Sequence, residues 1–115
     1  MKKLLFILFL FLQFFTSAQV DKNSELYQTI LSKDSLLFTV GFNTCYVSQF
    51  EKLTSENFEF FHDKDGISDK KKFINDLKNG LCGNPDNYQA RRELVKESTK
   101  IFALYKEGKI YGAMQ

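Results

Sequence analysis

The 115-residue sequence contains one histidine and two cysteines, and this scarcity excludes the familiar metal-binding patterns. Neither a His-x-x-x-His nor a Cys-x-x-Cys spacing occurs, although zinc sites usually need such pairs. The segment 63–66, Asp-Lys-Asp-Gly, is only faintly similar to a calcium loop, because it lacks the fifth-position ligand and the closing glutamate. We therefore expect no bound metal.

Motifs of common enzyme classes are missing as well. The sequence has no glycine-rich phosphate loop and no serine nucleophile motif. It also lacks internal repeats and low-complexity tracts. No motif therefore identifies a reaction, and we expect no cofactor.

Residues 1–18 have the three-part layout of a secretory signal peptide. Lys2 and Lys3 form a basic start, Leu4 to Leu12 is an unbroken apolar run, and Thr16-Ser17-Ala18 supplies small residues before a cut. A membrane-spanning helix needs about 20 apolar residues, so this run is too short. No cysteine follows it to suggest a lipoprotein anchor. We predict an exported protein, periplasmic or secreted, without membrane contact once the signal is removed.

The charge balance argues against nucleic-acid binding. The chain has 16 basic and 14 acidic residues, and Lys2 and Lys3 belong to the predicted signal, so residues 19–115 carry 14 of each. A near-neutral chain is not expected to bind nucleic acid or a membrane surface. The remaining 97 residues are enough for one domain and no more.

Cys45 and Cys82 are an even pair in a chain predicted to enter an oxidising compartment. A bond between them would close a loop of about 37 residues and contribute on the order of 4 kcal/mol of stability. Two buried free thiols are the alternative. The export signal favours the disulfide.

A helix is predicted over residues 21–42, with Asn23 or Ser24 as its N-cap. Apolar residues recur there at three- and four-residue steps: Leu26, Ile30, Leu31, Leu37, Phe38 and Phe42. Asp34 falls on the same stripe, and burying a bare carboxylate is expensive. It must therefore reach solvent, a partner or a cavity.

The segment 57–66 predicts a strand that runs into a tight turn at Asp65-Gly66. Alternation places one set of side chains on each face: Phe58, Phe60 and His62 on one, Glu59, Phe61 and Asp63 on the other. The first face is an apolar wall with a polar tip. Such a face favours a binding pocket.

The rest of the chain predicts two more helices and further strands. A short helix is expected at residues 47–53, and a longer helix is expected to begin with Ser68 as its N-cap. A strand over residues 91–105, bent near 97–98, should turn at Glu107-Gly108 into a strand over residues 109–114. Arg91 and Arg92 could bind an anionic ligand. Because alternation places them on opposite faces of the first of these strands, pairing with glutamates on a neighbouring strand is the expected role. The inward face of the longer helix is Phe73, Ile74, Leu77 and Leu81.

This order of elements indicates an α+β fold with helices on one face of a sheet. It also resembles the nuclear transport factor 2-like (SnoaL-like) superfamily, in its branch of exported bacterial domains of unknown function. Residues 58–66, 79–85 and 91–95 carry the resemblance, which extends over about residues 24–115. It implies a cone in which a curved, mostly antiparallel sheet wraps the first helix and leaves a pocket at its open end. Members of the superfamily usually continue with further strands, so residues 19–115 are expected to be an incomplete domain without its C-terminal strands.

The superfamily includes isomerases, dehydratases, epoxide hydrolases and non-catalytic binding domains, so the resemblance does not settle the function. We expect a non-catalytic module that binds a small hydrophobic ligand or a partner, with Phe38, Phe58, Phe60 and His62 at the pocket. The alternative is a lyase-, isomerase- or hydrolase-type enzyme with Asp34 and His62 as the catalytic pair. A third possibility is a truncated fragment without function.

Self-association through the sheet is the partner interaction that the sequence predicts. An edge strand over residues 109–114 would expose unpaired backbone groups, and its Gly112-Ala113-Met114 end has no lysine or proline to blunt the edge. The chain from residue 19 should therefore form oligomers or aggregates. Size-exclusion chromatography with light scattering checks this expectation, and a monodisperse monomer with a sharp cooperative melt would contradict it.

Overall fold

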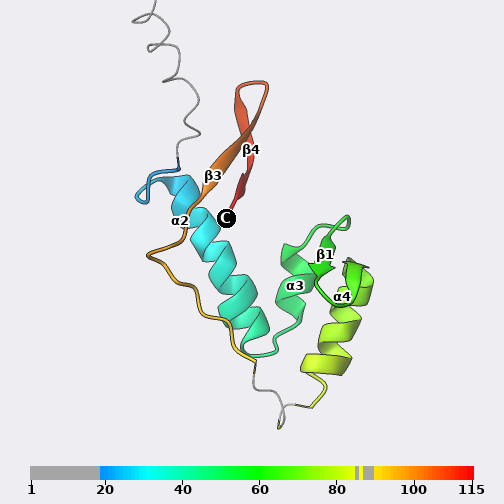
Figure 1. The fold of residues 1–115 in the computed structure, drawn as a ribbon. Coiled ribbons are helices and arrows are strands. Elements are labelled where there is room, and N and C mark those ends of the chain that lie inside the picture. Colours follow the sequence, from blue (N-terminus) through cyan, green and yellow to red (C-terminus); the bar gives the residue numbers. More distant parts are fainter. Residues whose placement is uncertain (1–18, 85, 87–89) are drawn as a thin grey trace, which may run out of the picture.

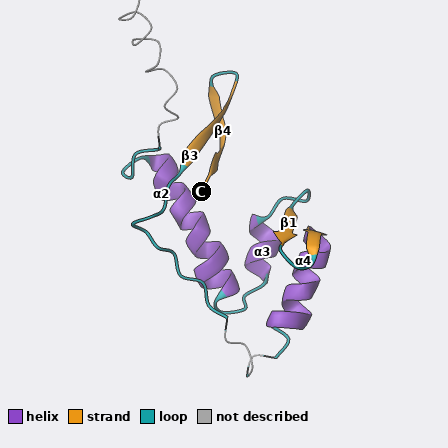
Figure 2. Cartoon of the chain, viewed as in Figure 1, coloured by secondary structure: helices purple, strands orange, loops and turns teal. Residues whose placement is uncertain are grey.

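The structure is a computed structural model, and it describes residues 19–84, 86 and 90–115 (Figure 1). Helices and antiparallel strands are both present, so the α+β class is confirmed (Figure 2). The elements are the helices α2 (Glu25–Asp34), α3 (Ser48–Leu53) and α4 (Lys70–Asp76), the π-helices η2 (Ser35–Phe42) and η3 (Leu77–Leu81), and the strands β1 (Glu59–His62), β2 (Gly66–Asp69), β3 (Phe102–Lys106) and β4 (Lys109–Met114). The predicted signal peptide lies outside the described residues. Within the described part, no helix is long and apolar enough to cross a membrane.

The first helix consists of α2 and η2, which follow each other without a break. Its N-cap is Ser24, one of the two predicted caps, whose hydroxyl accepts a hydrogen bond from the Tyr27 N–H at 3.2 Å. The most buried side chains of α2 are Tyr27 and Asp34, seven residues apart, and Gly41 continues the line in η2. The predicted apolar stripe flanks this line and is half-buried.

Gly41 allows α3 to approach η2 closely. A Cβ atom at this position would lie 3.0 Å from the Phe50 ring, so a larger residue would push the two helices apart. Phe50 is buried in the hydrophobic core between η2, α3 and α4. That core consists of Val47, Phe50, Ile74 and Leu77, with Leu37, Phe42, Phe73 and Cys82 packed around it.

Helix α4 begins later than the sequence predicted. Ser68 was expected to be its N-cap, but Ser68 is buried in β2 and the cap is Asp69, whose carboxylate accepts a 2.7 Å hydrogen bond from the Lys72 N–H. The reason is that residues 66–69 pair with β1 in a hairpin, placing Ser68 opposite Phe60. The predicted faces of β1 are confirmed, since Phe60 and His62 are half-buried while Phe61 is exposed. Leu81, predicted to face inward, is 48% exposed.

The segment before β3 is irregular, and the long strand predicted over residues 91–105 is present only as β3. Its backbone groups form hydrogen bonds with residues outside any sheet instead of with a neighbouring strand. The Asn43 amide donates to the Arg92 carbonyl at 2.8 Å and accepts from the Arg92 N–H at 2.9 Å. The Val20 N–H donates to the Ile101 carbonyl at 2.8 Å. The segment thus runs beside α2 and η2 from residue 90 to β3 (Figure 1).

Strands β3 and β4 form the predicted hairpin, with the bounds expected for β4. Glu107 and Gly108 make its turn with φ values of 51° and 75°, the left-handed pair that two-residue hairpin loops favour. This hairpin is a sheet of its own, as is β1–β2. The described residues therefore contain two separate two-stranded sheets, whereas one curved sheet was expected.

The predicted disulfide between Cys45 and Cys82 is confirmed, with a Cα–Cα distance of 5.6 Å. It joins the turn after η2 to the residue that follows η3. Cys45 has a φ of 55°, in the left-handed region that disfavours residues other than glycine. The covalent bond fixes this turn against the end of η3.

Replacing Cys82 with serine should lower the free energy of unfolding by about 4 kcal/mol, because the unfolded chain regains the entropy of an open 37-residue loop. Urea denaturation followed by circular dichroism measures the loss. Wild-type protein kept in reductant is the control and should show a similar loss. Two thiols labelled in denatured, unreduced wild-type protein would contradict the bond.

Candidate functional site

A cavity of about 870 Å³ lies between η2, α3, the β1–β2 hairpin and the α4–η3 helix. Its volume falls in the range of sites that hold drug-sized ligands, roughly 300–1,000 Å³. We call it the aromatic groove because phenylalanine rings form much of its wall. Its described lining residues are Phe38, Phe42, Phe50, Phe60, His62, Asp65, Ser68, Phe73, Asp76, Leu77, Gly80, Leu81, Asn84 and Ala90.

Both π-helices contribute to the aromatic groove. Phe38 and Phe42 come from η2, and Leu77, Gly80 and Leu81 come from η3. A π-helix is wider than an α-helix, and π-helical turns are rare and found frequently at functional sites. Two of them lining one cavity single out this part of the molecule as the candidate site.

The aromatic wall is a connected series of rings centred on Phe73. Its ring centroid lies 4.8 Å from that of Phe60 and 5.4 Å from that of Phe50, and Phe50 in turn meets Phe38 at 6.4 Å. These distances and the tilted or edge-on orientations are those that aromatic pairs prefer. Of the residues predicted for a pocket, Phe38, Phe60 and His62 line the groove. Phe58 is not among its described lining residues, but its ring packs 5.2 Å from that of Phe73.

His62 forms the polar end of the groove. Its Nδ1 accepts hydrogen bonds from the backbone N–H groups of Lys64 at 3.2 Å and Asp65 at 3.3 Å. The carboxylates of Asp63 and Asp65 each lie 3.4 Å from the same Nδ1. The turn thus fixes the orientation of the ring.

Asp34 lies outside the described lining of the groove and has a partner of its own. Its two carboxylate oxygens accept hydrogen bonds at 2.7 Å from the two terminal nitrogens of Arg92, and Gln115 donates to Oδ2 at 3.1 Å. The Asp34 side chain is almost fully buried, so this paired arrangement satisfies an otherwise costly charge. The structure does not bring Asp34 and His62 together on the groove wall. Their catalytic roles stay a prediction.

Sequence reasoning missed the partner of Asp34, which is Arg92. It was expected to pair with a glutamate across a sheet, yet its guanidinium binds Asp34 and lies 3.8 Å from the centroid of the Phe38 ring. Arg91, its neighbour, makes an exposed contact with Glu93 at 3.3 Å. An aspartate on an apolar helix stripe requires a cation, and the adjacent arginines were the signal that could have supplied one.

Carboxylates predominate near the mouth of the groove. Lys72 bonds the Asp76 carboxylate, and this bond, together with the nearby charges of Asp65 and Asp69, raises the pKa of Lys72 above its usual range. Among the described residues, no group of three or more potential ligands is arranged to hold a metal ion.

Comparisons of the chain find no matching family model and no significant match among curated proteins or solved structures. The candidate site therefore has to be interpreted from its own residues and their geometry.

Replacing Arg92 with methionine should lower the free energy of unfolding by roughly 3–5 kcal/mol, because it leaves the buried Asp34 carboxylate unpaired. The matched control is Arg91→Met, whose side chain is 72% exposed and whose loss should cost under about 1 kcal/mol. Urea denaturation of both variants measures the difference. Removing both charges with Asp34→Leu and Arg92→Met should cost less than the sum of the single changes. Equal losses for Arg91→Met and Arg92→Met would contradict the role given to the pair.

Proposed function

We propose that this chain is a non-catalytic binding module that holds a small hydrophobic ligand in the aromatic groove. The observation that carries the proposal is the wall itself, in which five phenylalanines surround a cavity of about 870 Å³. Ligand sites in proteins are typically concave, mostly apolar and supplied with a few convergent polar groups. His62 and the buried Ser68 are polar groups of this kind on the groove wall.

The proposal includes membership of the nuclear transport factor 2-like superfamily, as a domain exported by the predicted signal peptide. The α+β content and the long first helix support the family, and in this proposal the aromatic groove is the counterpart of the pocket that the resemblance implies. The disulfide supports export, because such bonds persist mainly in oxidising compartments. The complete cone of the superfamily would need one continuous sheet around the first helix.

A catalytic role has less support than binding. Both oxygens of Asp34 accept hydrogen bonds, and the carboxylate faces Arg92 rather than an open space. The Nδ1 atom of His62 is occupied by the backbone of its own turn. A general base needs a lone pair within reach of the proton that it removes. Asp34 and His62 do not present such lone pairs to one common position.

Partner binding through the β3–β4 hairpin is a second candidate. Each strand pairs on one side only, and the hairpin exposes large apolar side chains of Tyr105, Ile110, Tyr111 and Met114. Unpaired strand edges are templates for pairing with another chain. This hairpin is the surface that supports the expected self-association.

A bulky side chain in the aromatic groove should weaken ligand binding. Gly80 lines the groove, and a Cβ atom placed there meets nothing within 4 Å, so Gly80→Phe introduces a ring without a clash at its base. Nile red, a neutral apolar dye, should fluoresce on binding the wild-type chain, and Gly80→Phe should weaken that binding at least about tenfold. Gly80→Ala is the control for the backbone change and should bind the dye as the wild type does.

A second pair of variants separates the two faces of β1. Phe60→Ser removes a ring from the groove wall, whereas Phe61→Ser removes a ring from the exposed face of the same strand. Dye binding should fall in the first variant and remain in the second, with folding of each checked by circular dichroism. Failure of the wild-type chain to bind the dye, or equal binding by Gly80→Phe, would refute the proposal.

A further inference from the structure

The charged side chains on the wall of the aromatic groove are all of one sign. Asp65 and Asp76 belong to its described lining, which includes no lysine and no arginine. An apolar ligand with an anionic head would meet these carboxylates without a cation to receive it. The wall therefore discriminates between ligands by charge.

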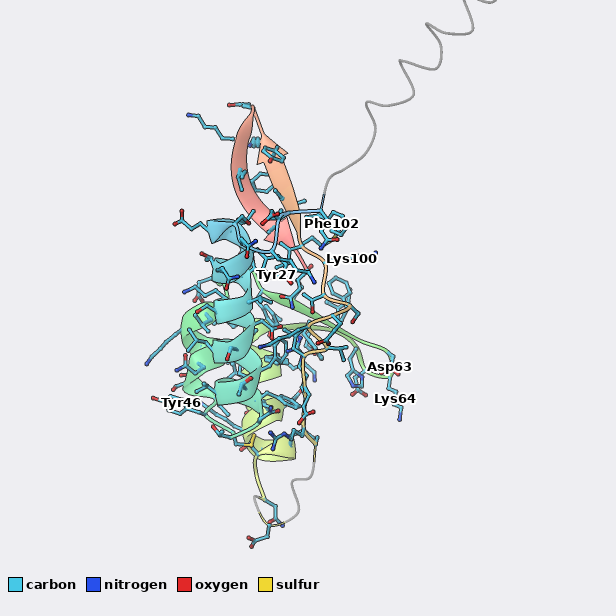
Figure 3. The ribbon with its side chains drawn as sticks, turned by 90° about the vertical axis from the view of Figure 1, so that its left-hand side faces the viewer. Tyr27, Tyr46, Asp63, Lys64, Lys100 and Phe102 are labelled. Carbon is cyan, nitrogen blue, oxygen red and sulfur yellow. A yellow bond between two sulfur atoms is a disulfide. The ribbon has the colours of Figure 1, made fainter. Side chains whose placement is uncertain are left out.

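The nearby cations do not neutralise this mouth. Lys72 is bonded to Asp76, which is the main cause of its raised pKa, and the nearby charges of Asp65 and Asp69 add to the effect. Lys64 projects with Asp63 from the tip of the β1–β2 turn, away from the helices (Figure 3). Nδ1 of His62 accepts the backbone N–H groups of Lys64 and Asp65, so this atom is already engaged by the turn.

The aromatic rings add an attraction for cations. The face of a phenylalanine ring is electronegative, and an ammonium or guanidinium placed over it is stabilised. Phe38, a wall residue, shows this directly, since the guanidinium of Arg92 lies 3.8 Å from its ring centroid. The charge of Arg92 is itself paired with Asp34, so it does not serve as a receptor for an anionic ligand.

We propose that the aromatic groove selects amphiphilic cations, meaning apolar molecules that carry a protonated amine, with Asp65 as the counter-ion of the amine. The apolar body lies against the phenylalanine wall, and the ammonium group lies at the acidic mouth. Asp65 is the better counter-ion of the two wall carboxylates, because Asp76 is directly bonded to Lys72, whereas the Asp65 carboxylate lies 3.4 Å from His62 Nδ1. This inference rests on the proposed ligand-binding function and adds the chemical class of the ligand.

The test compares three molecules with the same chain length and different heads. Dodecylamine, dodecanol and dodecanoate compete with Nile red for the wild-type chain near pH 7, where the amine is protonated and the acid is ionised. Each is kept below the concentration at which it forms micelles. Dodecylamine should displace the dye at about tenfold lower concentration than dodecanoate, with dodecanol between them. Salt at about 0.5 M should reduce this preference by screening the charges.

Two variants locate the counter-ion. Asp65→Asn should reduce the preference for the amine severalfold, whereas Asp63→Asn, at the neighbouring position on the turn tip, should leave it unchanged. If the dye binds but dodecanoate displaces it at least as well as dodecylamine, the cation inference is overturned. The ligand-binding function is then still supported. Equal effects of the two variants would also overturn it. If neither the dye nor any of the three molecules binds, the proposed function fails as well.

Discussion

The buried carboxylate of Asp34 constrains how the chain packs around α2 and η2. A charge in that position is tolerable only with a partner, and the partner, Arg92, lies 58 residues further along the chain. The bidentate contact therefore draws the irregular segment against α2 and η2, and the Asn43 amide bonds the backbone of the same residue. Because the guanidinium also covers the Phe38 ring, the pair fixes one wall of the aromatic groove.

The opposite wall is held by different forces. Close packing at Gly41 places α3 against η2, and Phe50 and Phe73 continue the aromatic contacts from α3 to α4. The disulfide then ties the end of η3 back to the turn after η2. An ion pair between Lys78 of η3 and Glu51 of α3 joins these two helices at their surface and lowers the pKa of Glu51. The groove is thus bounded by walls that are each fixed independently of a ligand, which suits a pre-formed binding site.

Local patterns were the part of the fold that the sequence predicted well. The Ser24 cap, the faces of β1 and the turn at Glu107-Gly108 depend on neighbouring residues alone, and all three agree with the structure. The predicted start of α4 was wrong because residues 66–69 pair with β1, and a paired Ser68 cannot cap a helix. The partner of Asp34 was missed for a related reason: an ion pair across 58 residues is set by tertiary packing. The π-helices have no sequence signal comparable to a cap or a turn.

The irregular segment between Arg92 and Ile101 also has a consequence for how the molecule opens. Two anchors flank it, at Arg92 and at the Val20–Ile101 bond, and a turn closed by Val95 and Ser98 lies between them. A segment with so few ladder bonds opens at a free energy well below that of global unfolding. Its amide protons are therefore expected to exchange with solvent earlier than those of α2. The β3–β4 hairpin lies beyond this segment, but Gln115 at its far end donates a hydrogen bond to Asp34, so local opening of the segment would leave the hairpin attached to α2 at that end.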